Sequence, residues 1–355
     1  MNTEDSRRMT TLRDRHASKL DAALEACRTR SAYSGWTENP SSKIHGEELP
    51  AAGRARFEAQ LGQPFALDQP AECGRIGDEV SPYTGEPLGV TYPRVDVPAL
   101  YEHIAAAAPA WARAEPGERI GVCLEILERC AQHLFENAHA TMHTSGQSYV
   151  MAFAGSGANA LDRGLEALAY AHKAMADVPR SGHWQRAFGR DGVADLHKRF
   201  RLVPRGVGVV ICCATFPLWN AYPALCASLA TGNPVVLKPH PCAVLPVAMV
   251  ARTAREVLAE AGYDANLVTL VADTRAAPAT QALLEQPATA IVDFTGSPRF
   301  GSWLEQNCPG KLVYTETAGC NSVVLESTSD LQATAKAIAQ SLCQASAQMC
   351  TSVQN

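Results

Sequence analysis

The chain has 355 residues, of which 46% are apolar and 19% charged, and its formal net charge is −5. This length allows two or three domains around a large buried core. The slight acidic excess argues against a nucleic-acid partner, and no run of about 18 apolar residues predicts a membrane-spanning helix. The polar N-terminus, MNTEDSRRMTTLRDRH, lacks the apolar stretch of a secretory signal, so we expect a cytoplasmic location without membrane attachment.

The twelve cysteines do not indicate a disulfide framework or a metal site. A cytoplasmic chain of this size needs no disulfides. No Cys-x-x-Cys occurs, and His and Cys do not cluster at the spacing of zinc ligands. We therefore expect no metal, and we expect most of these thiols to be small buried apolar groups.

The first 79 residues predict an N-terminal extension of mixed character. We expect a helix around Leu20–Cys27. Pro, Gly and polar residues in Glu38–Pro64 favour an irregular segment. Within Val80–Tyr92, the sequence Pro-Tyr-Thr-Gly predicts a turn between short extended pieces.

The next part of the chain predicts helices and a hairpin. After Pro116, apolar residues recur every three or four positions as far as Ala138, which predicts one long amphipathic helix. A second helix is expected at Ala158–Ala176. In Trp184–Val203, apolar and polar residues alternate loosely on both sides of Gly-Arg-Asp-Gly. This pattern predicts a β-hairpin with its turn at these four residues.

From Gly206 onward, β-rich runs alternate with helical patterns. This order predicts an α/β fold in which helices cover both faces of a parallel, Rossmann-type sheet. The expected strands are Val207–Cys213, Val235–Leu237, Leu267–Val271, Ala290–Phe294 and Leu312–Thr315, and the expected helices are Trp219–Ala230, Val244–Ala261, Thr280–Glu285 and Pro298–Gln306.

Three loops follow predicted strand ends, where parallel α/β sheets bind ligands: Cys213–Pro217, Lys238–Pro241 and Thr295–Gly301. In the third loop, Gly296 lets the backbone approach a ligand, and Ser297 can cap the next helix and offer its hydroxyl to a phosphate. An ordinary capped turn explains the same residues.

Three further residues have a functional and a structural interpretation. Lys238 ends a buried strand, where a cofactor ribose or phosphate could serve as its partner, or its ammonium group could extend to solvent. Glu316 also follows a strand and is either a general base or a solvated carboxylate. Cys350 is either a reactive thiol or one more buried cysteine.

Taken together and in this order, the motifs resemble the aldehyde dehydrogenase superfamily, from about Val80 to the end of the chain. The resemblance rests on VVICCATFPLWNAYPALCASLATGNPVVLKP (Val209–Pro239), FTGSPRFG, ETAGCNS and QMC. The runs ATFPLW and QMCTSVQN most resemble the aldehyde dehydrogenase-like proteins of bacterial phenylacetic acid degradation.

This resemblance implies a domain organisation. Residues 80–317 would form the cofactor-binding domain, interrupted by the hairpin at 184–203, which is similar to an oligomerisation arm of a homo-oligomer. Residues 318–355 would begin a second α/β catalytic domain. We expect the chain to be C-terminally truncated and inactive by itself.

The resemblance also implies residue roles in the oxidation of an aldehyde to a carboxylic acid with NAD or NADP. Cys350 would be the nucleophile that forms a thioester, and Glu316 the base that activates water. The Thr317 backbone would hold the nicotinamide carboxamide. Lys238 would contact the cofactor ribose, and Ser297 the pyrophosphate.

Several residues depart from the family pattern. Thr215 stands where an asparagine usually stabilises the oxyanion, with Asn220 as a possible substitute donor, and Ala347 replaces the usual glycine before Gln-x-Cys. Pro241 stands where NAD-preferring relatives have a glutamate. Loss of that carboxylate, with Lys238 as a cation and His240 as a second donor, predicts a preference for NADP over NAD.

Two other functions fit parts of this pattern. A CoA-acylating dehydrogenase releases its acyl group to a thiol, and members of that type usually lack the base, so Glu316 argues against it. Thr215 favours a non-catalytic binding or assembly protein, which Cys350 and Glu316 together oppose. The expected substrate is a small aldehyde, and the narrower resemblance suggests an aromatic catabolite, with a CoA-linked semialdehyde as one option.

Overall fold

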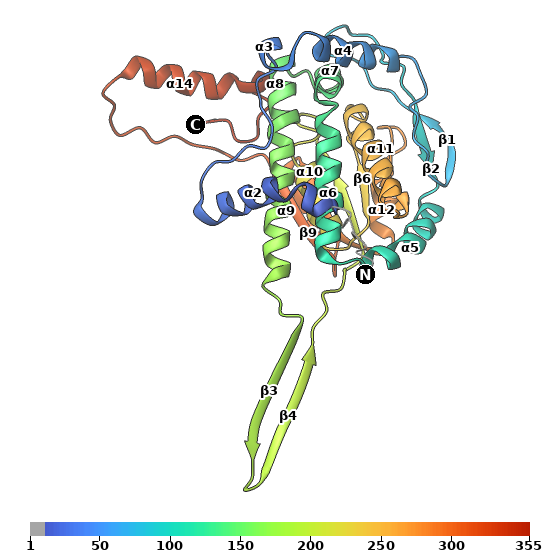
Figure 1. Cartoon of the computed structure of the whole chain (residues 1–355). Helices are drawn as coiled ribbons and strands as arrows, with labels where there is room; N and C mark the ends of the chain where they lie inside the picture. The colour runs from blue at the N-terminus through green and yellow to red at the C-terminus, as the bar shows by residue number, and fades with distance from the viewer. Residues whose placement is uncertain (1–10) are drawn as a thin grey trace, which may run out of the picture.

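The computed structural model describes residues 11–355. A parallel five-stranded sheet lies at its centre, in the order β7-β6-β5-β8-β9 (Figure 1). Its strands are β5 (Val207–Ile211), β6 (Val235–Lys238), β7 (Val268–Leu270), β8 (Thr289–Gly296) and β9 (Leu312–Thr317). All five strands were predicted from the sequence, within a few residues at their ends.

Helices cover both faces of this sheet, as predicted, because each strand alternates its side chains between two apolar cores. In β5, Val210 packs into the core shared with α6, α9, α10 and α11. Val207, Val209 and Ile211 pack into the opposite core with α5, α12 and α13. Strand side chains point alternately to the two faces, and here both sets are buried.

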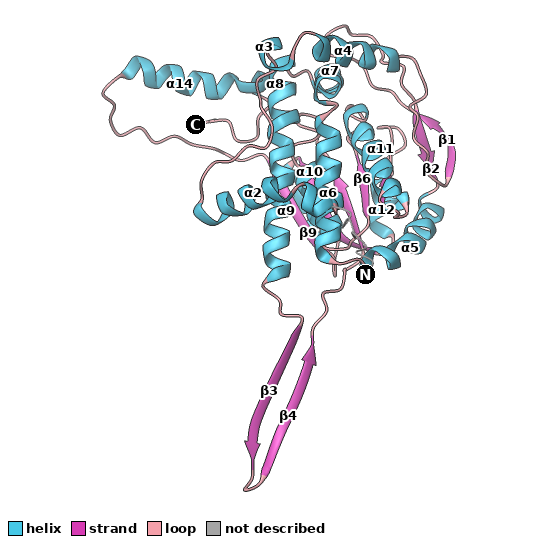
Figure 2. Cartoon of the chain, viewed as in Figure 1, coloured by secondary structure: helices cyan, strands magenta, loops and turns pink. Residues whose placement is uncertain are grey.

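The helices surround the sheet and extend beyond it (Figure 2). They are α1 (Leu12–Arg15), α2 (Ala17–Thr29), α3 (Ser42–His45), α4 (Glu48–Gln60), α5 (Val97–Arg113), α6 (Pro116–Ala131), α7 (Leu134–Ser145), α8 (Tyr149–Phe153), α9 (Asn159–Ala176), α10 (Ala221–Ala230), α11 (Leu245–Glu260), α12 (Thr280–Glu285), α13 (Pro298–Asn307) and α14 (Leu331–Cys343). A π-helical turn, Ala154–Ala158, joins α8 to α9.

Two predictions about the helices were wrong. The segment Glu38–Pro64 is not irregular, because it contains α3 and α4. Helix α4 packs closely on α7: a Cβ atom at Gly53 would lie 2.3 Å from Cβ of Phe135. This tertiary packing outweighs the low helix propensity of glycine.

The long helix predicted after Pro116 is two helices, α6 and α7. The chain leaves the helix at Gln132 and His133, and the His133 ring lies 3.0 Å from the Glu136 carboxylate in the first turn of α7. The apolar spacing continues across this break, so the pattern alone could not reveal it.

The segment before the first long helices is anchored by a buried carboxylate. The short strands β1 (Glu72–Ile76) and β2 (Tyr92–Val95) pair antiparallel. Between them, Glu79 accepts hydrogen bonds from the backbone N–H groups of Val244 and Leu245 at 2.6 and 3.0 Å, and from the Tyr92 hydroxyl. Burial raises the pKa of Glu79 to about 7. Glu79 thereby caps the start of α11.

The predicted hairpin is present and projects away from the rest of the chain (Figure 1). Strands β3 (Ser181–Phe188) and β4 (Gly192–Arg199) pair antiparallel through eight residue pairs. Gly189 in the turn has a φ of 68°, a left-handed conformation that glycine adopts without strain. In the described part of the chain, no helix is long and apolar enough to cross a membrane.

Candidate active site

The three loops singled out in the sequence meet at one cavity of about 1020 Å³. They do so because parallel strands place their carboxyl ends along one edge of the sheet. All the predicted site residues line this cavity: Thr215, Lys238, His240, Pro241, Gly296, Ser297, Glu316, Thr317 and Cys350. The cavity is at the upper end of the size range of small-molecule sites.

The loop after β8 leads directly into a helix that faces the cavity. Ser297 is the N-cap of α13, and its hydroxyl oxygen accepts the backbone N–H of Phe300 at 3.4 Å. A Cβ atom at position 296 would lie 2.5 Å from the Phe294 ring, so close packing requires glycine here. Helix α13 also packs tightly beside Thr317 through Gly301. The helix N-terminus and the cap can together receive an anionic group.

Lys238 already has a charged partner within the protein. Its Nζ atom lies 2.8 Å from Oδ1 of Asp273, which follows β7, and both side chains are at most 4% exposed. Lys238 also donates to the Pro239 carbonyl at 2.8 Å, and Asp273 accepts the Ala279 N–H at 2.9 Å. The charge partner of Lys238 is thus Asp273, and neither of the two alternatives weighed from the sequence, a cofactor group or solvent. The predicted contact of Lys238 with a cofactor ribose stays a prediction.

Loss of Asp273 is expected to destabilise the fold strongly. In Asp273→Asn, the Lys238 ammonium group stays buried without its counter-charge, which typically costs about 3–5 kcal/mol. We expect the free energy of unfolding in urea to fall by this amount at an unchanged m-value. Asp21→Asn, at an exposed position in α2, is the control.

A double replacement separates the charge effect from packing. Lys238→Met combined with Asp273→Leu removes both charges, and it should recover much of the lost stability. A single Asp273→Asn variant as stable as the unmodified protein would contradict the importance of this ion pair.

His240 and Pro241 complete this side of the cavity. The pKa of His240 is lowered by burial and by the positive charges of Lys238 and Arg275, so the ring is neutral at pH 7. Its Nδ1 atom accepts the backbone N–H of Cys242 at 3.2 Å. His240 therefore does not supply a second positive charge, although its Nε2–H can donate a hydrogen bond.

Cys350 and Glu316 lie together, as the mechanism inferred from the resemblance requires. The Cys350 thiol donates to Oε1 of Glu316 across 3.8 Å. Burial, together with the Glu316 carboxylate and Cys213, raises the pKa of Cys350. The thiol form is therefore favoured, and Glu316 is placed to accept the proton when the thiolate forms.

Asn321 holds the Cys350 segment, a role that sequence reasoning missed. Its Nδ2 atom donates to the carbonyls of Cys350 at 2.7 Å and Ser352 at 3.0 Å. Nearby, Ala347 has a φ of 61°, a left-handed conformation that favours glycine. This conformation suits the glycine that the resemblance implies at this position, and alanine here carries strain.

The two candidate oxyanion donors are engaged elsewhere. The Thr215 hydroxyl donates to the Cys213 sulfur at 3.7 Å, a weak contact that must break before Thr215 can serve an oxyanion. The Asn220 amide donates to the Thr295 hydroxyl at 2.6 Å. Asn220 thus ties the start of α10 to β8, and the suggestion that it replaces the missing asparagine loses support.

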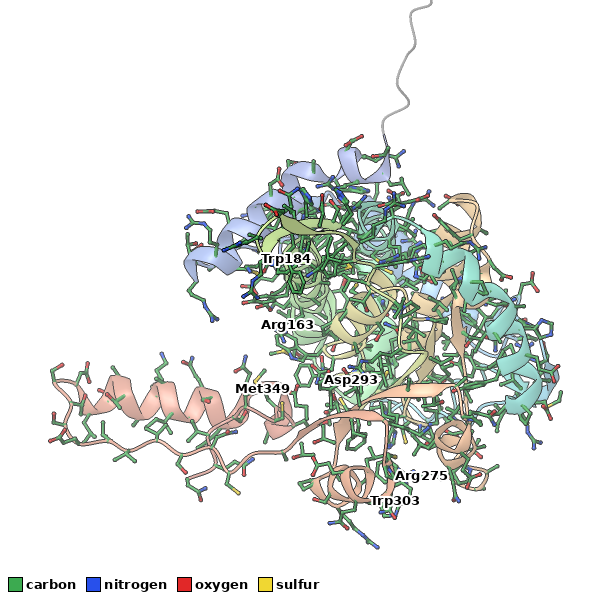
Figure 3. All side chains as sticks on the ribbon, turned by 90° about the horizontal axis from the view of Figure 1, so that it is seen from below. Arg163, Trp184, Arg275, Asp293, Trp303 and Met349 are labelled. Atoms are coloured by element: carbon green, nitrogen blue, oxygen red, sulfur yellow. The ribbon has the colours of Figure 1, made fainter. Side chains whose placement is uncertain are left out.

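A second carboxyl group, Asp293, lies near Glu316. Both side chains line a separate cavity beside α10 and β9, and Figure 3 shows Asp293 within the body of the molecule. Burial and the Glu316 charge raise the pKa of Asp293 to about 7. The sequence held one signal for it, an acidic residue within a predicted buried strand. Asp293 can therefore exchange a proton near neutral pH in the cavity whose wall it shares with Glu316.

The arrangement combines a thiol, an adjacent carboxylate and a cavity suited to a dinucleotide. The α13 N-terminus offers N–H donors for a pyrophosphate, and the cavity extends from there past Lys238 to Cys350. These residues fit a nicotinamide dinucleotide. Of the three N–H groups of the Lys238 ammonium, two are engaged by Asp273 and by the Pro239 carbonyl. One N–H is left to donate to a ribose hydroxyl.

Comparisons with known proteins agree with this geometry. The family whose description is "Aldehyde dehydrogenase family" matches residues 70–355. A crystal structure of an NAD-dependent aldehyde dehydrogenase from Burkholderia multivorans is 46% identical, with a TM-score of 0.92, over 97% of this chain and 62% of that one. A 1-pyrroline-5-carboxylate dehydrogenase from Thermus with bound NAD shares the fold, with 19% identity and a TM-score of 0.72 over 91% of this chain and 62% of that one.

Among curated proteins, a 1-pyrroline-5-carboxylate dehydrogenase from Bacillus cereus (strain B4264) is 34% identical over 163 residues. The match covers 44% of this chain and 31% of that relative. The chain thus matches less than two thirds of the length of these relatives. Because the family match covers most of the chain and agrees with the fold and the cavity, the chain belongs to the aldehyde dehydrogenase family.

Proposed function

We propose that this chain carries the cofactor site and the nucleophile of an enzyme that oxidises an aldehyde to a carboxylic acid with NAD or NADP. The observation that supports this most directly is the contact of the Cys350 thiol with Glu316 at 3.8 Å, on the wall of the dinucleotide-sized cavity. A thiol and a base in contact are what covalent aldehyde oxidation requires.

In the proposed reaction, the Cys350 proton leaves to solvent, directly or by way of Glu316, which is ionised again afterwards, and the thiolate attacks the aldehyde carbon. Backbone N–H groups near Cys350, with the Thr215 hydroxyl once freed from Cys213, stabilise the resulting oxyanion. A bound nicotinamide dinucleotide would accept the hydride from this carbon, and Cys350 would then hold the acyl group as a thioester. Glu316 then deprotonates the water that releases the acid and the free thiol.

The test uses the protein at its full natural length. Aldehydes of increasing size are added with NAD or NADP, and the absorbance of the reduced nicotinamide is followed. Parallel reactions contain CoA. Acid formation without CoA supports the proposal, whereas strict dependence on CoA indicates the acylating alternative. A protein that binds the dinucleotide but reduces none is the non-catalytic alternative.

The domain and assembly predictions belong to this proposal as well. Residues 80–317 would form the cofactor-binding domain and residues 318–355 the start of the catalytic domain. Helix α14 has no buried residue and Val324 is 93% exposed, which supports packing against further structure. The projecting hairpin, whose Phe188 is 77% exposed, supports a role as an arm in a homo-oligomer.

The substrate is proposed only at the level of an aldehyde. The ATFPLW and QMCTSVQN runs favour an aromatic aldehyde of phenylacetate degradation, with a CoA-linked semialdehyde as one option. The names of the curated relatives given above point instead to 1-pyrroline-5-carboxylate. Relative values of kcat/KM for an aromatic aldehyde and for pyrroline-5-carboxylate decide between the two.

For the cofactor, we expect NADP to be preferred, but by less than tenfold. Pro241 lacks the carboxylate that would repel a 2′-phosphate, whereas Asp273 neutralises Lys238 and so limits the attraction. Pro241→Glu should shift the ratio of kcat/KM values at least tenfold towards NAD, about 1.4 kcal/mol. The name of the Burkholderia multivorans neighbour opposes this expectation, and a tenfold preference of the unmodified enzyme for NAD would refute it.

A further inference from the structure

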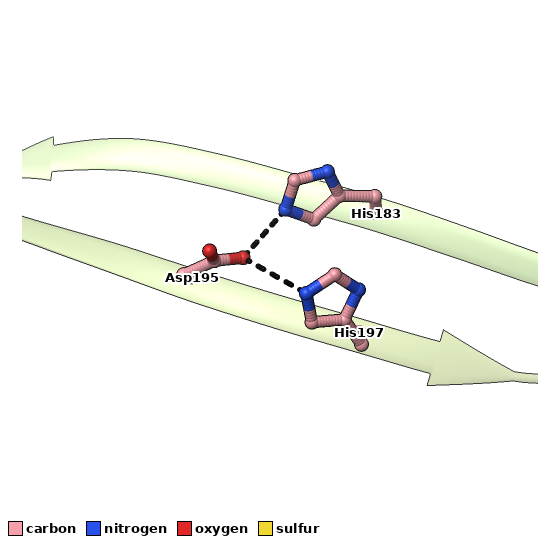
Figure 4. Close-up of side chains that lie close together, drawn as sticks. All are labelled: His183, Asp195 and His197. Carbon is pink, nitrogen blue, oxygen red and sulfur yellow. Dashed lines mark hydrogen bonds and ion pairs between the residues drawn. The ribbon is translucent and has the colours of Figure 1, made fainter.

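Three side chains of metal-ligating types lie together on the hairpin, outside the cavity of the candidate active site: His183, Asp195 and His197 (Figure 4). Asp195 and His197 are two residues apart in β4 and so share one face of the strand. His183 in β3 lies directly opposite His197 in the ladder. Strand pairing, and not sequence spacing, brings them together, which is why the sequence did not predict a metal site.

The donor atoms of the three side chains converge. Nε2 of His183 lies 2.6 Å from Oδ1 of Asp195, and Nε2 of His197 lies 3.7 Å from the same oxygen. The two imidazole rings are stacked, with centroids 4.3 Å apart and an interplanar angle of 3°. One ligand atom from each residue lies within 4.8 Å of the others.

A neighbouring side chain orients the carboxylate. Gln185 donates from Nε2 to Oδ2 of Asp195 at 3.1 Å, which leaves Oδ1 directed at the two histidines. Hydrogen bonds of this kind to a ligating carboxylate are typical of metal sites, where they fix the first ligands. The three ligand side chains are 44–78% exposed, so a cation can reach them from solvent.

We propose that His183, Asp195 and His197 form a site for a divalent first-row metal ion, with Zn²⁺ the best suited. Two imidazoles and one carboxylate, with water in the remaining position, are a ligand set that Zn²⁺ favours. Bonds of about 2.0–2.2 Å in a tetrahedral site place ligand atoms roughly 3.4 Å apart. The observed separations bracket this value, so small side-chain rotations complete the site.

Such a site would have a structural consequence for the hairpin. A two-stranded ribbon is marginally stable by itself in water. The metal would join β3 to β4 near the base of the hairpin, at the pair His183 and His197. It would therefore hold the two strands together where they leave the rest of the molecule.

The test measures metal binding directly. The tag-free, chelator-treated chain is titrated with Zn²⁺ by calorimetry and with Co²⁺ by visible absorption. We expect one equivalent per chain at this site, and at least tenfold weaker binding in His183→Gln, in His197→Gln and in Asp195→Asn. His103→Gln, at an exposed histidine of α5, is the matched control and should bind normally.

A fluorescence measurement assigns the metal to the hairpin. Trp184 adjoins His183, so Co²⁺ should quench its emission, and Trp184→Phe should remove this quenching while the calorimetric signal remains. Unchanged Trp184 emission without metal shows that the histidine variants keep the hairpin. Binding that survives in both histidine variants, or no stoichiometric binding at all, overturns the proposal.

Discussion

Replacement of Cys350 by alanine is expected to abolish aldehyde oxidation and leave dinucleotide binding intact. Cys350 is the thiol in contact with Glu316 on the cavity wall, and the proposed chemistry has no thioester without it. Loss of the covalent nucleophile of a serine protease lowers kcat by about 10⁶. Turnover is measured from nicotinamide reduction, and binding from the quenching of protein fluorescence by NAD and NADP.

The control for this experiment is Cys320→Ala, which removes an exposed thiol from the neighbouring segment. That variant should retain turnover within a few-fold. If Cys350→Ala kept turnover within tenfold of the unmodified enzyme, another residue would be the nucleophile. Cys213 would then be examined next, because its sulfur is close enough to influence the pKa of Cys350.

The rate at which Cys350 is alkylated should depend on pH, because it follows the fraction of the thiol that is ionised. Because burial and nearby negative charge raise the pKa of its thiol above the ordinary value of 9.0, the thiolate fraction at pH 7 is small. Alkylation of Cys350 by iodoacetamide should therefore accelerate with pH beyond pH 9. Bound NAD(P), with its cationic nicotinamide near the sulfur, is expected to shift this profile to lower pH.

The parts of this structure that sequence could predict are those that depend on local patterns. Strands β5 to β9 were predicted because continuous apolar runs between turn residues are typical of strands buried on both faces. The convergence of the loops at 213–217, 238–241 and 295–301 followed, because parallel strands share one carboxyl edge. Cys350 was singled out by a motif; the structure places its thiol 3.8 Å from Glu316, and its role as the nucleophile stays a prediction.

The features that could not be predicted depend on contacts between distant residues. Lys238 was expected to need a partner, but nothing local indicated Asp273, which lies 35 residues further along the chain. Asn321 reaches the Cys350 carbonyl across 29 residues. Helix α4 depends on a close approach to α7 at Gly53. In each case the deciding energy comes from tertiary packing or from satisfying a buried polar group.

Glu316→Gln is expected to slow the release of acid much more than the transfer of hydride. Glutamine keeps the size of the side chain but cannot take a proton from water, and loss of a general base typically costs about 10²–10⁴ in rate. Rapid mixing should show a burst of reduced nicotinamide, close to one equivalent per active site, followed by a slow steady state. Acid quenching during the steady state should trap the acyl group on Cys350. Glu326→Gln, at an exposed position in the same C-terminal segment, is the control and should show no burst.

Glu316→Gln also tests a second role of Glu316, its influence on the pKa of Cys350, which we infer from their contact at 3.8 Å. The carboxylate raises the pKa of Cys350, so its removal should lower that pKa and increase the thiolate fraction at a given pH. Alkylation of Cys350 at pH 8 should therefore be faster in Glu316→Gln than in the unmodified protein.

Faster alkylation together with a full burst means that Glu316 acts mainly on water after the thioester has formed. If the burst disappears while alkylation still accelerates, the carboxylate is needed to remove the thiol proton once aldehyde is bound, and its main role lies before hydride transfer. If alkylation does not change, the influence of Glu316 on Cys350 inferred from their contact is wrong.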